Sequence, residues 1–283
     1  MILVTGGTGT VGREVVAQLL AKGEKFRILT RSPAKAEHLK GKVEIAEGDL
    51  DKAETLPAAM QGVDHLFLLT VDQVTVSDSN VIQAAKAAGV KHVVKISTNF
   101  VENDPQTGVG RWHAEKEKLL KASGLAWTIL RPGAFMSNTL NWAGSIKSQG
   151  AVYNSAGESK SAAIDPADIA AVAVEALTKP GHEGKAYDLT GSEMLTYKEQ
   201  VAILAEVIGK PIKTVDISVE AALEGMRKYR QMGPALEQGM REMLTAIAAG
   251  QLTRTVTQDV FTVTGKQPRT FKVWCEAHKA AFV

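Results

Sequence analysis

The chain has 283 residues, a formal net charge of +2 and one cysteine, and its 45% hydrophobic and 23% charged residues are typical of a soluble globular protein. The single Cys275 excludes an intramolecular disulfide and a cysteine-rich metal site, and the scattered basic residues give no support for a nucleic-acid partner. No stretch approaches the ~20 apolar residues of a membrane span and no signal peptide fits the amino terminus, so we expect no membrane partner and a cytoplasmic location.

The chain begins with an apolar strand, a glycine-rich turn and a helix. Residues 1–20 read Met-Ile-Leu-Val-Thr, then Gly-Gly-Thr-Gly-Thr-Val-Gly, then an amphipathic run. Gly6 allows a sharp turn off the strand, Gly9 lets the backbone approach a diphosphate, and Gly12 lets the helix pack closely on the sheet. The helix amino terminus offers N–H groups and a partial positive charge to phosphates. This order predicts a dinucleotide-binding βα unit; a merely structural glycine turn is the weaker alternative.

Strands and helices alternate through the first half of the chain. Apolar and β-branched runs predict strands at residues 26–30, 43–46, 65–69, 92–96 and 127–130. Amphipathic stretches predict helices at residues 33–40, 53–60, 79–88 and 112–122, with glycine stops at Gly23, Gly89 and Gly124. Near-continuous apolar strands separated by such helices predict an α/β fold, a Rossmann-type doubly wound parallel sheet.

After residue 133 the alternation of strands and helices becomes less regular. Short strands are predicted at residues 151–154 and 186–189, around a helix that begins near Pro166. Beyond residue 196 the chain is predicted mostly helical, with one strand at residues 212–215. We therefore divide the chain into a dinucleotide-binding domain at residues 1–133, to which some later segments return, and a smaller, mostly helical substrate-binding lobe at residues 134–283. Exposed helical faces in this lobe are compatible with a homodimer and do not require one.

The residues after the second strand indicate which dinucleotide binds. An NAD site usually has Asp or Glu here, whereas residues 29–35 read Leu-Thr-Arg-Ser-Pro-Ala-Lys. The Arg31 guanidinium can hold a 2′-phosphate, Ser32 can add a hydroxyl donor, and Lys35 can supply a second cation. The alternative is that Arg31 and Lys35 are solvated surface charges. For Arg31 this alternative is weaker than phosphate binding, and for Lys35 the two are about equal. We expect NADPH and NADP⁺ as the cofactor.

Two further strand ends are predicted to contact the adenosine side of this cofactor. After the third strand, Asp49 could accept a hydrogen bond from the adenine amino group while Leu50 packs on the ring. A turn or helix-cap aspartate is a nearly equal alternative for Asp49. After the fourth strand, Leu69 and Thr70 are expected along the adenosine and ribose side, on the ground of position rather than chemistry.

The chain lacks the Tyr-x-x-x-Lys pair that many dehydrogenases with this fold use. Alignment of Lys116 with the lysine puts Trp112 at the tyrosine position, and indole cannot donate a useful proton. His113 and Glu117 share a helical face, so His113 could protonate a substrate; equally well, it could pair with Glu117 or orient the lobes. The six dispersed histidines predict no metal site, and the sequence contains no Gly-x-Ser-x-Gly hydrolase motif after a strand.

Several of these motifs together resemble the NmrA-like family of atypical short-chain dehydrogenase/reductases. The resemblance spans essentially the whole chain and rests on residues 6–12, 31–35, 48–50, 113–117, 128–136, 181–185, 255–260 and 268–271. The chain is most similar to a bacterial branch that contains NADPH:quinone oxidoreductases, triphenylmethane dye reductases and flavin-free azoreductases. The resemblance implies that the cofactor is held by Gly6, Thr8, Gly9, Thr10, Val11 and Arg31. It also implies that Asn99, Phe100 and residues 132–138 frame the nicotinamide and the substrate.

The resemblance implies NADPH-dependent hydride transfer, without flavin, to quinones, azo dyes or related conjugated acceptors. Such acceptors delocalise the incoming charge, so the protein mainly has to position the two reactants. Phe100, Trp112, Phe135 and Met136 could form a flat pocket for an aromatic or quinonoid substrate. For each of them except Phe135, a core position at the seam between the lobes is the slightly stronger alternative. The alternatives are a non-catalytic NADP(H)-sensing regulator of NmrA type and, last, a sugar-nucleotide epimerase, which normally needs the tyrosine pair.

Overall fold

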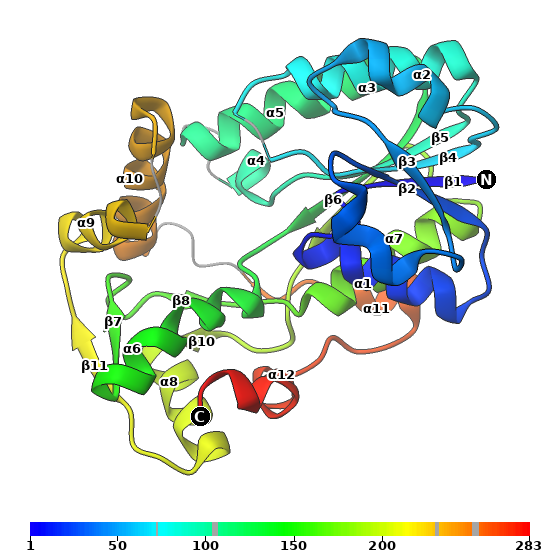
Figure 1. Ribbon diagram of the computed structural model, residues 1–283. Helices are drawn as coiled ribbons and strands as arrows, with labels where there is room; N and C mark the ends of the chain where they lie inside the picture. The colour runs from blue at the N-terminus through cyan, green and yellow to red at the C-terminus, as the bar shows by residue number, and fades with distance from the viewer. Residues whose placement is uncertain (72, 104–106, 230–231, 251–254) are drawn as a thin grey trace.

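The computed structural model describes residues 1–71, 73–103, 107–229, 232–250 and 255–283. Its centre is a seven-stranded parallel sheet of order β3-β2-β1-β4-β5-β6-β9 (Figure 1). The strands are β1 (Ile2–Thr5), β2 (Phe26–Thr30), β3 (Glu44–Glu47), β4 (His65–Leu68), β5 (His92–Ile96), β6 (Ala126–Pro132) and β9 (Lys185–Leu189). The strand order reverses between β1 and β4, which is the doubly wound arrangement. The predicted Rossmann-type sheet is confirmed.

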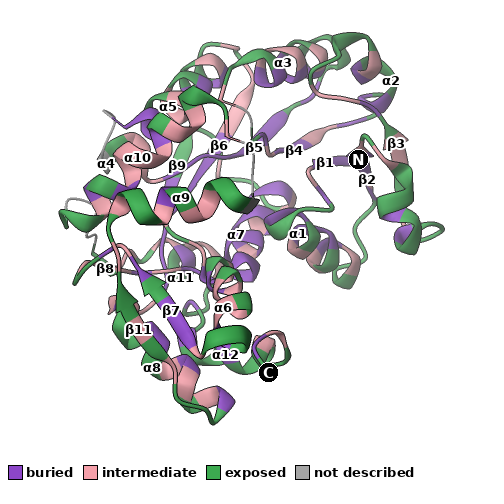
Figure 2. Cartoon of the chain, turned by 60° about the vertical axis from the view of Figure 1, so that its left-hand side comes forward, coloured by how far each residue is buried: buried purple, intermediate pink, exposed green. Residues whose placement is uncertain are grey.

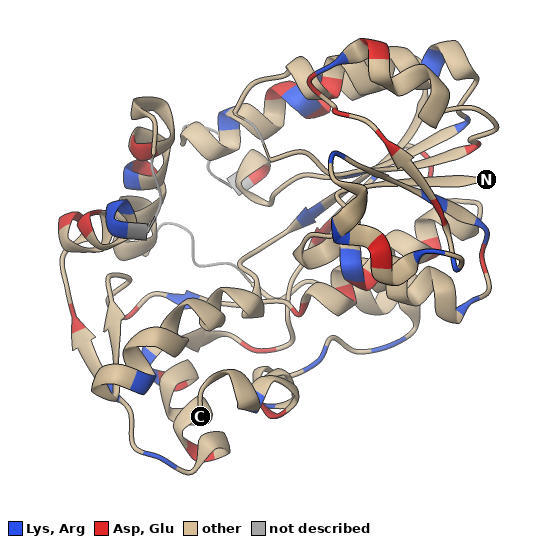
Figure 3. Cartoon of the chain, viewed as in Figure 1, with Lys and Arg blue, Asp and Glu red and all other residues tan. Residues whose placement is uncertain are grey.

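Helices cover both faces of this sheet, and its inner strands are correspondingly buried, whereas the residues of the edge strand β3 are half-buried or exposed (Figure 2). One face packs against η1 (Pro33–Leu39), α1 (Thr10–Ala21), α7 (Pro166–Thr178) and α11 (Asp259–Thr264). The other face packs against α2 (Leu56–Ala59), which follows η2 (Ala53–Thr55), and against α3 (Val76–Ala88) and α5 (Gly108–Lys121). Charges of both signs are interspersed over these helices in the view of Figure 3.

The remaining elements form the smaller, mostly helical lobe. Its core joins η3 (Met136–Trp142), α6 (Ala143–Gln149), α8 (Tyr197–Ile208) and α12 (Phe271–His278), followed by η4 (Lys279–Ala281), and it contains the buried Cys275. Two short sheets pair β7 (Ala151–Asn154) with β11 (Lys213–Asp216) and β8 (Lys160–Ser161) with β10 (Leu195–Thr196). Beyond the carboxyl ends of the large sheet's strands lie α4 (Phe100–Asn103), α9 (Val219–Tyr229) and α10 (Pro234–Ala248) (Figure 1).

The structure differs from the sequence predictions mainly at the ends of elements. The predicted strand at residues 186–189 belongs to the edge of the large sheet as β9, and α7 packs on α1, so segments beyond residue 133 return to the sheet layers. The predicted helix at residues 53–60 is split into η2 and α2, because Pro57 lies in the first turn of α2. The domain boundary at residue 133 stays a prediction. No described helix has both the length and the apolar character that a membrane crossing requires.

Candidate cofactor and substrate site

The turn between β1 and α1 is too tight for a side chain at Gly12. A Cβ atom on Gly12 would lie 2.0 Å from the Gly6 carbonyl oxygen. Gly6 itself has a φ of +65°, and the Gly9 N–H donates to the Gly6 carbonyl oxygen at 2.9 Å. Because L side chains rarely adopt such a φ and the turn has no space for a methyl group, backbone geometry requires glycine at both positions.

This turn brings the amino terminus of α1 to the carboxyl edge of the sheet. Gly9 is the residue before the first helical turn, and no side chain caps the helix there. Thr8, Gly9 and Thr10 are exposed, whereas Val11 is buried in the core. The first-turn N–H groups and the helix dipole therefore face solvent at a backbone that can be approached closely. These residues fit the diphosphate of a dinucleotide.

Two arginines of the second βα unit differ in what they bind. Arg27 in β2 donates to Glu44 through Nε at 2.9 Å and to the Ala59 carbonyl oxygen at 2.7 Å, so it is part of the fold. Arg31, just beyond β2, is exposed and makes no hydrogen bond or ion pair within the described part of the chain. Lys35 is exposed in η1, with its backbone N–H bonded to the Ser32 carbonyl oxygen at 3.0 Å. The second strand thus ends in two cations and one hydroxyl, suited to a phosphate.

The segment that follows β3 forms a turn. Asp49 Oδ1 accepts a hydrogen bond from the Asp51 N–H at 3.2 Å, and the Asp49 N–H donates to Thr55 Oγ1 at 3.0 Å. The Leu50 carbonyl oxygen accepts from Asn80 Nδ2 at 3.0 Å. Both Asp49 and Leu50 are half-buried. Asp49 therefore has the turn role that the sequence left open for it, while its Oδ2 makes no hydrogen bond within the described part of the chain.

Leu69 and Thr70 close the same edge after β4. The Leu69 side chain lies against the glycine turn, with Cδ2 3.2 Å from the Cβ position of Gly6. The Leu69 N–H donates to Thr5 Oγ1 at 2.8 Å, which ties the ends of β1 and β4 together. Thr70 is buried, and its hydroxyl points into a polar cluster rather than along the glycine turn.

That cluster consists of Thr70, Asp78, Lys95 and Lys116, and it was not predicted from the sequence. Thr70 Oγ1 donates to Asp78 Oδ2 at 2.8 Å, and Lys116 Nζ lies 3.3 Å from Thr70 Oγ1 and 3.4 Å from Asp78 Oδ2. Lys95 Nζ is bonded to Asp78 Oδ1. Burial alone would raise the pKa of Asp78, but the two ammonium groups lower it below its usual range. The cluster holds the end of β4 against α3 and α5.

His113 lies on α5 beside this cluster. Its Nδ1 is buried and has no hydrogen-bond partner in the part of the chain that the structure describes. Burial lowers the pKa of His113 to about 4, and the charges of Lys95 and Lys116 lower it as well, so the imidazole is neutral at pH 7. Glu117, one turn along α5, accepts hydrogen bonds from Ser97 Oγ at 2.7 Å and from Arg131. The carboxylate that the sequence paired with His113 is therefore bound elsewhere.

Asn99 and Phe135 lie at the carboxyl ends of β5 and β6. A Cβ atom on Gly133 would lie 3.1 Å from Asn99 Nδ2, and the Asn99 N–H donates to the Pro132 carbonyl oxygen at 3.2 Å. Glycine at position 133 thus lets the Asn99 amide rest on the start of the segment that carries Phe135. Phe135 and Phe100 are both half-buried at this edge.

Met136 and Trp112 are engaged in packing. Met136 is 2% exposed within the core of the smaller lobe, and its Cε lies 3.5 Å from the Cβ position of Gly191. The Trp112 indole rests against Gly239 of α10. The structure thus brings Asn99, Phe100 and Phe135 to the same edge, whereas Met136 is buried in the core of the smaller lobe.

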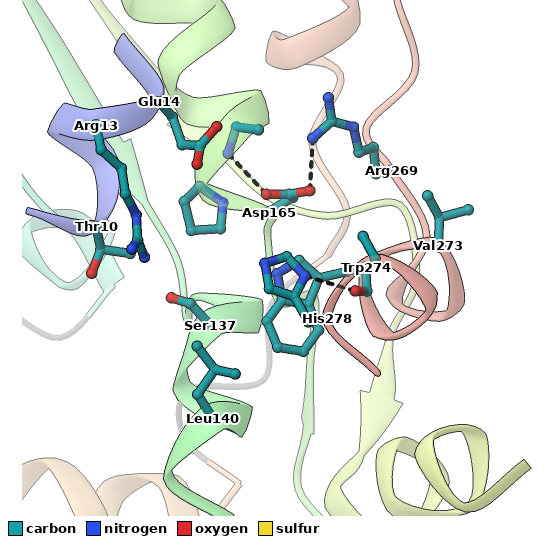
Figure 4. A pocket seen from close by; sticks show the side chains of 13 residues that line it. Thr10, Arg13, Glu14, Ser137, Leu140, Asp165, Arg269, Val273, Trp274 and His278 are labelled. Carbon is teal, nitrogen blue, oxygen red and sulfur yellow. Dashed lines mark hydrogen bonds and ion pairs between the residues drawn. The ribbon is translucent and has the colours of Figure 1, made fainter. Parts of the chain in front are cut away.

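A cavity of about 150 Å³ lies between the amino termini of α1 and α7 and the smaller lobe (Figure 4). Thr10 and Arg13 reach into it from α1 and face Ser137 of η3. On the opposite side, Asp165 caps α7 and binds Arg269 Nη1 at 2.9 Å. The start of α1 is therefore the place where the sheet layers and the smaller lobe meet. Among the described residues, no group of His, Cys, Asp and Glu is arranged to hold a metal ion.

Comparisons with known proteins agree with this geometry. A family profile described as NAD(P)H-binding matches residues 6–180. NAD(P)H azoreductase of Xenophilus azovorans is 43% identical over 100% of this chain and 99% of its own length. Quinone oxidoreductase 2 of Escherichia coli is 35% identical over 77% of this chain and 78% of its own. The chain belongs to the NAD(P)H-binding, NmrA-like family.

The crystal structure of NADPH-dependent quinone oxidoreductase QOR2 of Escherichia coli, complexed with NADPH, matches this NmrA-like protein with a TM-score of 0.86. The two are 29% identical, and the match covers 99% of this chain and 100% of the other. The resemblance inferred from the sequence is confirmed, as is the expectation of an enzyme: the NmrA-like protein is an NAD(P)H-dependent reductase.

Proposed function

We propose that the protein transfers a hydride directly from NADPH, without a flavin, to quinones, azo dyes or related conjugated acceptors. The cofactor assignment rests on one observation: Arg31, exposed and unpaired within the described chain, follows β2, and β2 pairs with β1, the strand that leads into the glycine turn. The similarity to an azoreductase and to a quinone oxidoreductase supports the acceptor class. A cytoplasmic location and a homodimer stay predictions from the sequence.

In this proposal, different residues at the carboxyl edge of the sheet bind different parts of the cofactor. The N–H groups at Thr8, Thr10 and Val11 bind the diphosphate, Gly6 shapes the turn, and Gly9, whose own N–H donates to the Gly6 carbonyl oxygen, lets the backbone approach closely. Arg31 and Ser32 bind the 2′-phosphate, with Lys35 as a second cation. Asp49 and Leu50 flank the adenine, and Leu69 and Thr70 border the ribose. When bound, the cofactor supplies a hydride at its nicotinamide ring.

His113 takes a role that does not require a protonated imidazole. With a pKa of about 4 it is neutral at pH 7, so it acts as a hydrogen-bond donor to the acceptor's oxygen or nitrogen. The hydride brings two electrons to the acceptor, and the proton that completes the hydroquinone or hydrazine comes from water. An acceptor that delocalises the added charge does not need a phenolic acid beside it, which accounts for the missing tyrosine.

The acceptor is proposed to lie at the edge formed by β5, β6 and α5. Phe100 and Phe135 offer aromatic surface for a planar ring, and the Asn99 amide fixes the start of this segment. Trp112 and Met136 support the pocket from behind. Positioning of two flat π-systems face to face then supplies most of the rate.

Oxidation of NADPH by flavin-free protein with a panel of quinones and azo dyes tests the proposal. Turnover with at least one acceptor class supports it, and inert behaviour with the whole panel overturns it. If the acceptors are inert and NADPH and NADP⁺ bind equally well, the regulator alternative is the better description.

A further inference from the structure

Helix α10 packs closely against α5, the helix that carries His113, and the contact is made at one glycine of each helix. A Cβ atom on Gly108, the first residue of α5, would lie 3.1 Å from Gly239 Cα in the middle of α10. The Trp112 indole fills the space beside them: a Cβ atom on Gly239 would lie 2.6 Å from its Cη2 and 3.2 Å from its Cζ2. The two helices therefore meet at a contact that has no room for one more methyl group.

A polar contact reinforces this approach. Glu242, one turn along α10 from Gly239, accepts a hydrogen bond from the Gly108 N–H at 2.7 Å. Arg111 Nη2 lies 3.5 Å from the same carboxylate oxygen. A carboxylate at the amino terminus of a helix binds N–H groups that the helix itself leaves unpaired. Glu242 thus caps α5 from outside and fixes α10 against it.

The other end of α10 is tied to the smaller lobe. Ser159, in the connection between β7 and β8, donates its hydroxyl to the Ile247 carbonyl oxygen. Gly239 and Ile247 are eight positions apart, about 12 Å along a helix. Helix α10 therefore bridges α5 and the smaller lobe, beyond the carboxyl ends of the strands (Figures 1 and 2).

The hairpin of α9 and α10 has a composition suited to flat aromatic molecules. Four of the chain's eight methionines lie within residues 226–243, namely Met226, Met232, Met240 and Met243, and all four are half-buried. Thioether side chains are flexible and polarisable, and they adapt to aromatic rings of different outline.

We propose that α10 is the wall that selects acceptors by size, and that the contact of Gly239 with Trp112 sets its distance from α5. The ligand class is an extended, planar aromatic acceptor that enters between α10 and the ends of β5 and β6. This inference rests on the proposed function. Trp112, the residue before His113, is then a positioning residue, because its indole fixes the distance between α10 and α5.

The variant Gly239→Ala tests the inference, with Gly225→Ala in α9 as a matched control. Both variants replace a helical glycine by alanine, but a Cβ atom on Gly225 meets nothing within 4 Å. The added methyl group at position 239 would lie 2.6 Å from the Trp112 indole, and we expect α10 to move outward to make room for it. We expect the ratio of kcat/KM for a naphthyl azo dye to that for benzoquinone to rise about fivefold or more in Gly239→Ala, and to stay unchanged in Gly225→Ala.

A folded Gly239→Ala protein with an unchanged or lower ratio overturns the inference, even though benzoquinone is still reduced. Failure of the unsubstituted protein to reduce any quinone or azo dye of the panel overturns the proposed function instead, so the two failures are distinguishable. If Gly239→Ala does not fold, Glu242→Gln replaces it, since this change keeps the side-chain shape and removes the charge that caps α5. A rise in the same ratio supports the inference, and an unchanged ratio overturns it.

Discussion

Arg131 and Glu117 form a buried ion pair that joins β6 to α5. Arg131 Nε and Nη2 donate to the two carboxylate oxygens at 2.9 Å and 2.7 Å, and Arg131 Nη1 also binds Glu102 of α4. The two paired side chains are 7% and 2% exposed. Residues 132–136 follow Arg131 directly, and His113 lies one turn before Glu117. The pair therefore fixes the proposed acceptor segment of β6 relative to the helix that carries His113.

Removal of Arg131 is expected to destabilise the protein strongly. Arg131→Met leaves the Glu117 carboxylate buried without its two-point partner, which costs about 3–5 kcal/mol of unfolding free energy. Lys121→Met is the control: Lys121 binds the same carboxylate at 3.1 Å, but its side chain is 40% exposed. Loss of so exposed a partner costs less than about 1 kcal/mol. Urea unfolding measures both values, and equal losses for the two variants contradict this assignment.

Substitution of Arg31 is expected to remove the preference for NADPH. Loss of one charge-assisted, two-point contact with the 2′-phosphate weakens NADPH binding in Arg31→Ala about 10- to 100-fold, since such contacts contribute about 1.5–3 kcal/mol. NADH affinity stays the same, because NADH lacks this phosphate. Fluorescence titration with both nucleotides gives the values, and Lys35→Ala shows whether the second cation takes part. Equal affinities of the unsubstituted protein for NADPH and NADH contradict the prediction.

Gly12 is expected to accept no side chain without loss of the cofactor site. In Gly12→Ala the methyl group would lie 2.0 Å from the Gly6 carbonyl oxygen, so the turn must open and the first-turn N–H groups of α1 move. NADPH affinity should fall at least about tenfold, because these N–H groups no longer converge on one anion. Gly144→Ala in α6, where the added methyl group meets nothing within 4 Å, is the control. Tight NADPH binding by a folded Gly12→Ala protein is incompatible with the proposed site.

The protein is expected to lose stability below the ordinary titration range of histidine. His92, at the start of β5, is 3% exposed and its Nε2 lies 2.9 Å from Thr128 Oγ1. Burial lowers the pKa of His92, and that of His65, below the usual 6.5. In mildly acidic solution the unfolded chain then binds protons that the folded protein does not, so the unfolding free energy is retained above pH 6.5 and falls as the pH drops below it.

Urea unfolding over a series of pH values measures this effect. His92→Gln, which keeps a hydrogen-bonding group and cannot titrate, should flatten the decline in acid. The matched control is His38→Gln, which makes the same substitution at an exposed histidine side chain. A slope that His92→Gln does not change shows that this imidazole is not responsible.

The sequence predicted most of the sheet and the glycine turn, because both depend on local signals. Near-continuous apolar runs mark strands that are buried on both faces, and the spacing of Gly6, Gly9 and Gly12 reflects contacts within a single βα unit. Element ends were less predictable. Helix α5 begins at Gly108, four residues before the predicted start, because the Thr107 hydroxyl caps it by accepting from the Gly110 N–H at 3.1 Å.

The polar interior could not be predicted in the same way, because its partners are far apart in the chain. The helical spacing of His113 and Glu117 suggested a pair, but the buried Arg131 guanidinium offers Glu117 a stronger, two-point contact. Lys95 in the otherwise apolar strand of residues 92–96 was a usable signal, since a lysine there needs a buried anion. The sequence did not show that this anion is Asp78.

Single-turnover reduction of a quinone under anaerobic conditions distinguishes direct hydride transfer from NADPH from reduction through a flavin. Flavin-free protein is mixed with benzoquinone and with NADPH that carries deuterium at the transferred position. Direct hydride transfer predicts one hydroquinone per NADPH oxidised, a slower reaction with the deuterated cofactor, and no acceleration by added FMN or FAD. It is contradicted if NADPH binds but is not oxidised, or if it is oxidised only after a flavin is added.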